Sequence, residues 1–154
     1  MTGVPDVGDV APEISLPSTE GHFSLYERVD EGSVLLVFYP KDDTLVCTRQ
    51  LCNYRDHLSM FDRYRVHVVG INHDSLDTHE AFAARHKFGF PLVSDVDRAA
   101  SRDYGVLLDL FKMRRTLVLV GEDRRIWWRH SELRLFHRDA ADLEKVIEEV
   151  QPAS

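Results

Sequence analysis

The sequence has little that would suit a membrane protein, an exported protein or a nucleic-acid-binding protein. Its longest apolar run, around Val34–Tyr39, is far shorter than the roughly 20 residues that a membrane-spanning helix needs. The first residues, Met-Thr-Gly-Val-Pro-Asp, contain no basic stretch followed by an apolar one, so we expect no secretory signal. Lysine and arginine number 19 against 26 aspartates and glutamates, and the net charge of -7 disfavours nucleic acids and anionic membranes as partners. These absences predict a cytoplasmic protein with neither kind of partner.

Cysteine is scarce as well, because the chain has only Cys47 and Cys52. In a protein without an export signal, such a pair is more typical of catalytic or redox chemistry than of a structural disulfide. The eight histidines are scattered, and neither a Cys-x-x-Cys nor a His-x-x-x-His pair occurs, so we expect no metal site and no cofactor.

The chain also lacks internal repeats, low-complexity tracts and linkers, so we expect a single domain over residues 1–154. A buried strand at 33–39, an amphipathic helix at about 44–64 and a second buried strand at 66–71 form a βαβ unit with parallel strands. The remaining predicted elements are an N-terminal hairpin (14–16 and 23–26), helices (75–86, 97–104 and 139–150), a short extended piece (92–93) and late strands (116–120 and 125–130). This order predicts an α/β sandwich of the thioredoxin kind, with a central mixed sheet flanked by helices.

The helix predicted at 44–64 separates the two cysteines. One apolar face contains residues at helical spacing, namely Cys47, Leu51, Tyr54, Leu58 and Phe61. Cys52 lies about 140° around the helix from Cys47, on a polar face, so we expect it near solvent. Cys47 would point inward from the first turn, where unpaired N–H groups and the helix dipole favour a thiolate. The alternative for Cys47 alone is a small buried hydrophobe.

The residues around Cys47 carry a family resemblance. Pro40-x-x-x-Thr44-x-x-Cys47 resembles the active-site signature of the peroxiredoxins, and the longer run Phe38–Cys52 is similar to their PrxQ, or bacterioferritin-comigratory, branch. Further ordered matches lie at Gly8-Asp9-x-Ala11-Pro12, Phe90-Pro91-Leu92-x-Ser94-Asp95, Tyr104-Gly105-Val106 and Arg114-x-Thr116. Two departures stand close to the site: Leu45-Val46 replaces the usual Pro-Gly, and Gln50 replaces a frequent Glu.

The resemblance implies a peroxidase that reduces hydrogen peroxide and organic hydroperoxides. Cys47 would attack the peroxide and become a sulfenic acid, and Cys52 would resolve it as an intramolecular disulfide. A thioredoxin or similar dithiol would then reduce the disulfide, in a protein that is a monomer or a weak homodimer. Thr44 would direct its hydroxyl at the thiolate or the peroxide, with helix capping as its other reading. Pro40 would shield the sulfur from water.

An arginine from a late strand would stabilise the thiolate and the developing oxyanion. The family pattern places it two residues before the hydroxyl residue that opens the strand, and it therefore implies Arg114. Arg115 is the rival, because neighbouring residues in a strand point to opposite faces.

Two other functions stay open at this point. The chain could be a thiol-disulfide sensor or switch of thioredoxin fold without efficient peroxide turnover, or a purely structural thioredoxin-fold module. Neither of these needs Thr44, Pro40 and Arg114 around the sulfur, so these three residues discriminate between the functions.

Overall fold

The fold was determined as a computed structural model that describes residues 4–107, 113–132 and 138–151. The ends of the expected domain, 1–3 and 152–154, lie outside the described residues. The strands are β1 (Ser15–Ser18), β2 (Gly21–Ser24), β3 (Ser33–Phe38), β4 (Val66–Asn72), β5 (Leu92–Ser94), β6 (Arg115–Val120) and β7 (Ile126–Glu132). The helices are α1 (Leu25–Arg28), the 3-10 turn η1 (Val29–Glu31), α2 (Leu45–Asp56), α3 (Leu58–Arg63), α4 (Leu76–His86), α5 (Ala99–Asp103) and α6 (Ala140–Val150).

The strands form one mixed sheet in the order β2-β1-β5-β4-β3-β6-β7. The predicted βαβ unit is confirmed, because β3 and β4 pair in parallel on either side of the connection through α2 and α3. Strand β6 joins the other edge of β3 in the antiparallel sense, and β7 follows β6 as a hairpin. The predicted N-terminal hairpin is β1 with β2. The sheet therefore places the end of β3 at its centre, where α2 begins.

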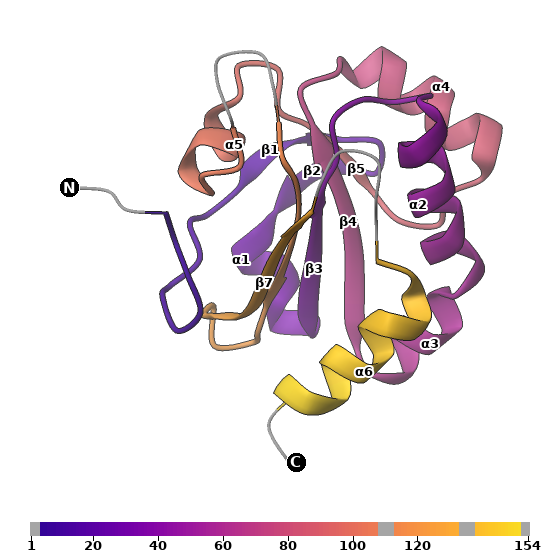
Figure 1. Ribbon diagram of the computed structural model, residues 1–154. Coiled ribbons are helices and arrows are strands. Elements are labelled where there is room, and N and C mark those ends of the chain that lie inside the picture. The colour runs from indigo at the N-terminus through magenta and orange to yellow at the C-terminus, as the bar shows by residue number, and fades with distance from the viewer. Residues whose placement is uncertain (1–3, 108–112, 133–137, 152–154) are drawn as a thin grey trace.

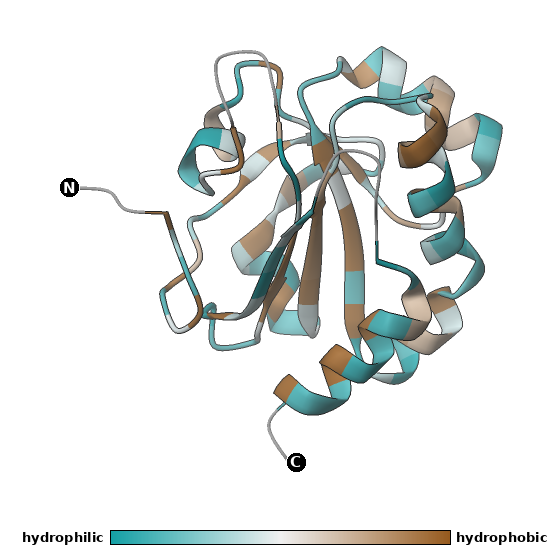
Figure 2. Ribbon diagram, viewed as in Figure 1, coloured by the Kyte–Doolittle hydropathy of each residue, from teal (hydrophilic) through white to brown (hydrophobic). Residues whose placement is uncertain are grey.

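Helices cover both faces of this sheet, with α2, α3, α4 and α6 on one side and α1 and α5 on the other (Figure 1). Alternate residues of β3 enter different cores: Leu35 and Val37 face α2, whereas Leu36 and Phe38 face α5. All six residues of β3 are buried, as expected for a strand covered on both faces, and Figure 2 shows this central strand as hydrophobic along its length. No helix in the described part of the chain is long and apolar enough to cross a bilayer.

The single helix predicted over 44–64 is wrong in one respect, because it divides at His57. This residue ends α2 and precedes α3 with φ -121° and ψ 21°, outside helical geometry. Its ring nitrogen Nδ1 donates to the carbonyl of Asn53 over 2.7 Å. The helix that carries both cysteines is therefore a separate unit of 12 residues.

Candidate active site

Cys47 occupies the first turn of α2, just beyond the end of β3, as the sequence predicts. Its exposed fraction is 1%, and it packs in the core between the sheet and α2. The backbone bond from the Thr48 amide to the Thr44 carbonyl, 2.8 Å long, is the first of the helical ladder. The amides of Leu45, Val46 and Cys47 precede that ladder, so the positive end of the helix dipole lies at the sulfur.

The arginine beside Cys47 is Arg115, and the expectation of Arg114 is wrong. Nη2 of Arg115 donates to Cys47 Sγ over 3.2 Å, and the side chain is 2% exposed. Arg114 is exposed. The alternation of side chains along β6 gives the reason. Leu117 and Leu119 belong to the core under α2, so the odd-numbered residues of β6 face Cys47. Arg114 precedes the strand by one residue and therefore points away.

Gln50 holds the arginine from its other side. It is fully buried one turn after Cys47, and its Oε1 accepts a hydrogen bond from Arg115 Nη1. The amide nitrogen of Gln50 donates to the Tyr54 hydroxyl over 3.2 Å, and that hydroxyl donates to the carbonyl of Arg138 over 2.7 Å. Burial raises the pKa of Tyr54, so the phenol keeps the proton that it donates. Because Gln50 is a neutral acceptor, it orients the guanidinium without neutralising it.

Thr44 and Pro40 lie on the loop between β3 and α2. Thr44 is the N-cap residue by its backbone, with φ -84° and ψ 154°, but its side chain does not cap the helix. Its hydroxyl instead donates to the carbonyl of Lys41 over 3.1 Å. Pro40 is half-buried and directly follows the buried residue Tyr39. The capping role considered for the Thr44 hydroxyl is therefore wrong, and the hydroxyl is held within the loop.

Cys52 is half-buried on α2, less exposed than its place on a polar helical face predicts, because it packs against the edge of the core. Its Sγ lies 3.8 Å from Nδ1 of His86, at the end of α4. Burial raises the pKa of the Cys52 thiol, nearby Asp56 raises it further, and Arg55 opposes both effects. Both cysteines are free thiols in this structure.

A buried polar network fixes the loop between β3 and α2, and the sequence pattern did not predict it. Asp42 is 4% exposed, and its Oδ2 lies 2.6 Å from Nδ1 of the fully buried His79 on α4. The other carboxylate oxygen of Asp42 accepts from the Tyr39 hydroxyl (2.5 Å) and from Asn72 Nδ2 (3.3 Å). Nε2 of His79 contacts the carbonyl of Val93 over 3.0 Å, and because a carbonyl only accepts, this nitrogen carries a proton.

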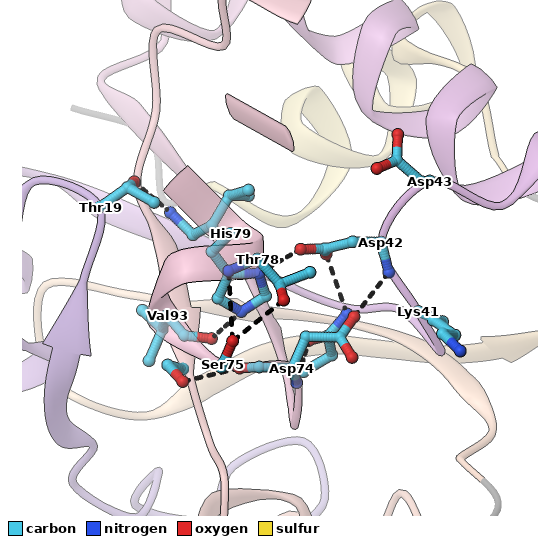
Figure 3. Close-up of polar contacts among 12 residues, drawn as sticks. Thr19, Lys41, Asp42, Asp43, Asp74, Ser75, Thr78, His79 and Val93 are labelled. Atoms are coloured by element: carbon cyan, nitrogen blue, oxygen red, sulfur yellow. Dashed lines mark hydrogen bonds and ion pairs between the residues drawn. The ribbon is translucent and has the colours of Figure 1, made fainter. Parts of the chain in front are cut away.

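Figure 3 shows Asp42 joined by dashed lines to both His79 and Asp74, with Asp43 lying apart from them. The Asp42 amide donates to Asp74 Oδ2 over 2.8 Å, so both the backbone and the side chain of Asp42 are fixed. Burial and the neighbouring Asp42 carboxylate raise the pKa of Tyr39 well above its ordinary value, which keeps its hydroxyl a donor. The loop that leads into Cys47 is therefore attached to β4 and α4 at the base of the site.

A buried cysteine at a helix start, paired with an arginine from a strand of a thioredoxin-like sheet, is an arrangement suited to a thiol-dependent peroxidase, and the comparisons with known proteins give this class. The model of the AhpC/TSA family matches residues 7–129, and the chain belongs to this family, in its peroxiredoxin Q branch.

Individual relatives agree with this assignment. A Coxiella burnetii protein named as a bcp peroxiredoxin is 35% identical over an alignment of 125 residues that covers 77% of this chain and 83% of that protein. The chloroplastic peroxiredoxin Q of Sedum lineare is 32% identical over 142 residues, covering 92% of this chain and 74% of the relative. The crystal structure of peroxidoxin BcpB from Mycobacterium tuberculosis superposes with a TM-score of 0.86 at 30% identity, over 96% of this chain and 99% of that one.

Proposed function

We propose that Cys47 is the peroxide-reacting cysteine and that Cys52 is the resolving cysteine of the same chain. The Cys47 thiolate attacks one peroxide oxygen, the O–O bond breaks, and the other oxygen leaves as hydroxide or alkoxide. The Cys52 thiolate then attacks the sulfenic sulfur, so that a disulfide forms and hydroxide leaves, which takes a proton from solvent to become water. A dithiol of the thioredoxin type reduces the disulfide and regenerates both thiols. The substrates are hydrogen peroxide and organic hydroperoxides.

The contact between Arg115 Nη2 and Cys47 Sγ, 3.2 Å long and buried, carries this proposal. A positive guanidinium and the unbonded amides at the start of α2 stabilise a thiolate, and the same donors stabilise the negative charge that develops on the peroxide oxygen. A simple thiol-disulfide switch needs two sulfurs but does not need a buried arginine oriented by Gln50. The arrangement therefore favours turnover of peroxide over the sensor alternative.

Pro40 and Thr44 complete the proposed site from the loop before α2. The ring of Pro40 has no N–H to attract water, so it keeps the sulfur in a poorly hydrated surrounding. The Thr44 hydroxyl, which donates to the carbonyl of Lys41 in this state, is three residues from Cys47 and turns toward the peroxide when substrate binds. We take the working unit to be a monomer or a weak homodimer.

Disulfide formation requires a change in α2. Residues five apart on a regular helix have Cα atoms roughly 8–9 Å apart. A disulfide accepts at most about 7 Å between Cα atoms, so Cys47 and Cys52 cannot bond while α2 is intact. We therefore include local unwinding of residues 44–53 in the proposed cycle, with the first turn opening most easily because it has the fewest internal hydrogen bonds.

The assignment of the two cysteines is tested by single-turnover oxidation of the reduced protein with hydrogen peroxide and with a bulky hydroperoxide. Cys47→Ser should abolish peroxide consumption, whereas Cys52→Ser should still form one sulfenic acid per chain. Trapping with dimedone and peptide mapping should place the label on Cys47. A label on Cys52 in an active Cys47→Ser protein would overturn the assignment.

A further inference from the structure

His86 lies between the proposed resolving cysteine and a carboxylate. Its Nδ1 is 3.8 Å from Cys52 Sγ, and its Nε2 is 3.9 Å from Asp43 Oδ1. The three residues come from different elements: Cys52 from α2, His86 from the end of α4, and Asp43 from the loop before α2. The imidazole thus lies between a thiol and a carboxylate, and at 3.9 Å the carboxylate acts on the ring through its charge, without a hydrogen bond.

The imidazole is fixed in this orientation by its surroundings. The ring packs edge-on against Phe82, with centroids 5.2 Å apart, and stacks on Phe88 at 5.6 Å. Arg55, one turn after Cys52 on α2, donates from Nη1 to the His86 carbonyl over 2.7 Å. This bond anchors α2 to the end of α4 just beyond the segment 44–53 that opens, and so limits how far Cys52 can move from the ring.

Cys52 needs a base if it is to resolve a sulfenic acid. Only the thiolate attacks sulfur, and burial raises the pKa of the Cys52 thiol, so the protonated form predominates near neutral pH. The charged groups around the pair are Arg55 and Asp56 on α2, and Arg85, whose Nη1 lies 2.5 Å from Asp43 Oδ1. Of these groups, Arg55 favours the thiolate and Asp56 opposes it.

We propose that His86 is the general base of the resolution step, with the nearby Asp43 carboxylate favouring the imidazolium that forms. Nδ1 takes the proton from Cys52 Sγ, and the sulfur electron pair then attacks the sulfenic sulfur of Cys47. The S–S bond forms as the S–O bond breaks, and the leaving hydroxide takes up the proton that the imidazolium releases to solvent, which gives water. Cys52 is oxidised and the sulfenic sulfur is reduced, so no further reagent is needed. This inference rests on the proposed function, in which Cys52 resolves Cys47.

The test is a quenched-flow experiment on the reduced protein with one equivalent of hydrogen peroxide. Intact masses of the thiol, sulfenic acid and disulfide forms separate oxidation of Cys47 from resolution by Cys52. His86→Gln should leave the oxidation rate within about twofold and slow resolution by roughly a hundredfold, the lower range for loss of a general base. Added imidazole should restore part of the resolution rate, which a purely structural defect would not allow. His22→Gln, on β2, is the matched control and should change neither phase.

The pH dependence provides a readout that does not rely on a variant. In the unmodified protein the resolution rate should fall at acid pH with the same midpoint as the protonation of His86, followed by NMR. In His86→Gln the rate should instead rise about tenfold per pH unit through neutral pH, because only the spontaneous thiolate fraction reacts. Asp43→Asn should slow resolution less than His86→Gln.

Either of two results would overturn the role of His86 alone. One is resolution at the unmodified rate in His86→Gln. The other is a resolution rate in the unmodified protein whose pH midpoint differs from that of His86 protonation. Failure of the proposed function looks different. In that case the unmodified protein either would not oxidise Cys47 or would keep the sulfenic acid without forming a Cys47–Cys52 disulfide.

Discussion

Replacing Asp42 by alanine should be among the most destabilising single changes in this protein. The buried carboxylate accepts hydrogen bonds from the Tyr39 hydroxyl and Asn72 Nδ2, and it shares a third hydrogen bond with His79 Nδ1. Asp42→Ala leaves all three groups without this partner. Removing one partner of a buried, hydrogen-bonded pair costs about 3–5 kcal/mol, and three unsatisfied polar groups at about 1–3 kcal/mol each give a similar or larger sum.

The expected change in melting temperature follows from the length of the chain. An unfolding entropy of about 2.1 cal/mol/K per residue gives roughly 0.32 kcal/mol/K for 154 residues. A loss of about 3–5 kcal/mol then lowers Tm by roughly 9–15 °C. Thermal unfolding of the reduced protein, followed by far-UV circular dichroism with a reductant present, measures this shift.

Two asparagine variants make the test specific. In Asp42→Asn the amide oxygen still accepts from Tyr39 and Asn72, and the amide nitrogen lies beside His79 Nδ1 as a donor, so most of the stability should return. Asp43→Asn removes the neighbouring charge, whose ion pair with Arg85 is largely exposed, with side-chain exposures of 42% and 58%. Its loss should cost at most about 1 kcal/mol, or roughly 3 °C. Asparagine also tolerates the left-handed φ of 62° at this position.

The reasoning fails if Asp42→Ala melts within about 3 °C of Asp43→Asn. That result would mean that the buried donors find other acceptors, or that water enters the network at little cost. An Asp42→Asn protein as unstable as Asp42→Ala would show instead that the negative charge, not the hydrogen bonding, stabilises the loop.

Three further predictions concern the reacting sulfur. Arg115→Ala should slow oxidation of Cys47 by about a hundredfold or more in stopped flow, and Arg114→Ala should change it little; equal damage from both would contradict the register. Gln50→Leu removes the acceptor that orients the guanidinium, and it should slow oxidation by an intermediate factor of roughly ten. An unchanged rate would show that Arg115 does not need Gln50 for its orientation. Oxidation should speed amide exchange across residues 44–53, reversibly on adding dithiothreitol; unchanged protection would point to resolution by an outside thiol.

The sequence predicts the position of Cys47 well because α2 has a polar face. Apolar residues recur on one side of this helix only, so their phase assigns Cys47 and Leu51 to the buried side without knowledge of the neighbours. The βαβ order likewise predicts the parallel pairing of β3 with β4. Local patterns are enough wherever one side of an element contacts water and the other does not.

The error at the arginine has the opposite cause. Strand β6 is buried on both faces, so Leu117 and Val118 are equally apolar and their pattern does not show which of them faces α2. The choice between Arg114 and Arg115 then depends on the pairing of β6 with β3, which sequence spacing alone does not give.

The Asp42–His79 pair and the break at His57 were missed for other reasons. Asp42 and His79 are 37 residues apart, and they meet only because the loop after β3 and the start of α4 lie at the same end of the sheet. His57 has neither the fixed φ of proline nor the freedom of glycine, so no residue type marks the end of α2 there. The Asp42–His79 pair therefore arises from tertiary contacts, which a local sequence pattern does not report.

The attachments of α2 are unequal along its length, and this has a consequence for the return of the enzyme to its reduced state. Beyond the segment 44–53 that opens, its later part is bound to other elements by Tyr54 through the Arg138 carbonyl and by Arg55 through the His86 carbonyl. When the disulfide is reduced, the opened segment therefore meets a turn that is already formed. Starting a helix is the slow, unfavourable event, whereas adding residues to an existing turn takes about nanoseconds each. The active site should re-form by elongation from a retained nucleus, far faster than any thiol exchange, so the refolding of α2 should not limit turnover.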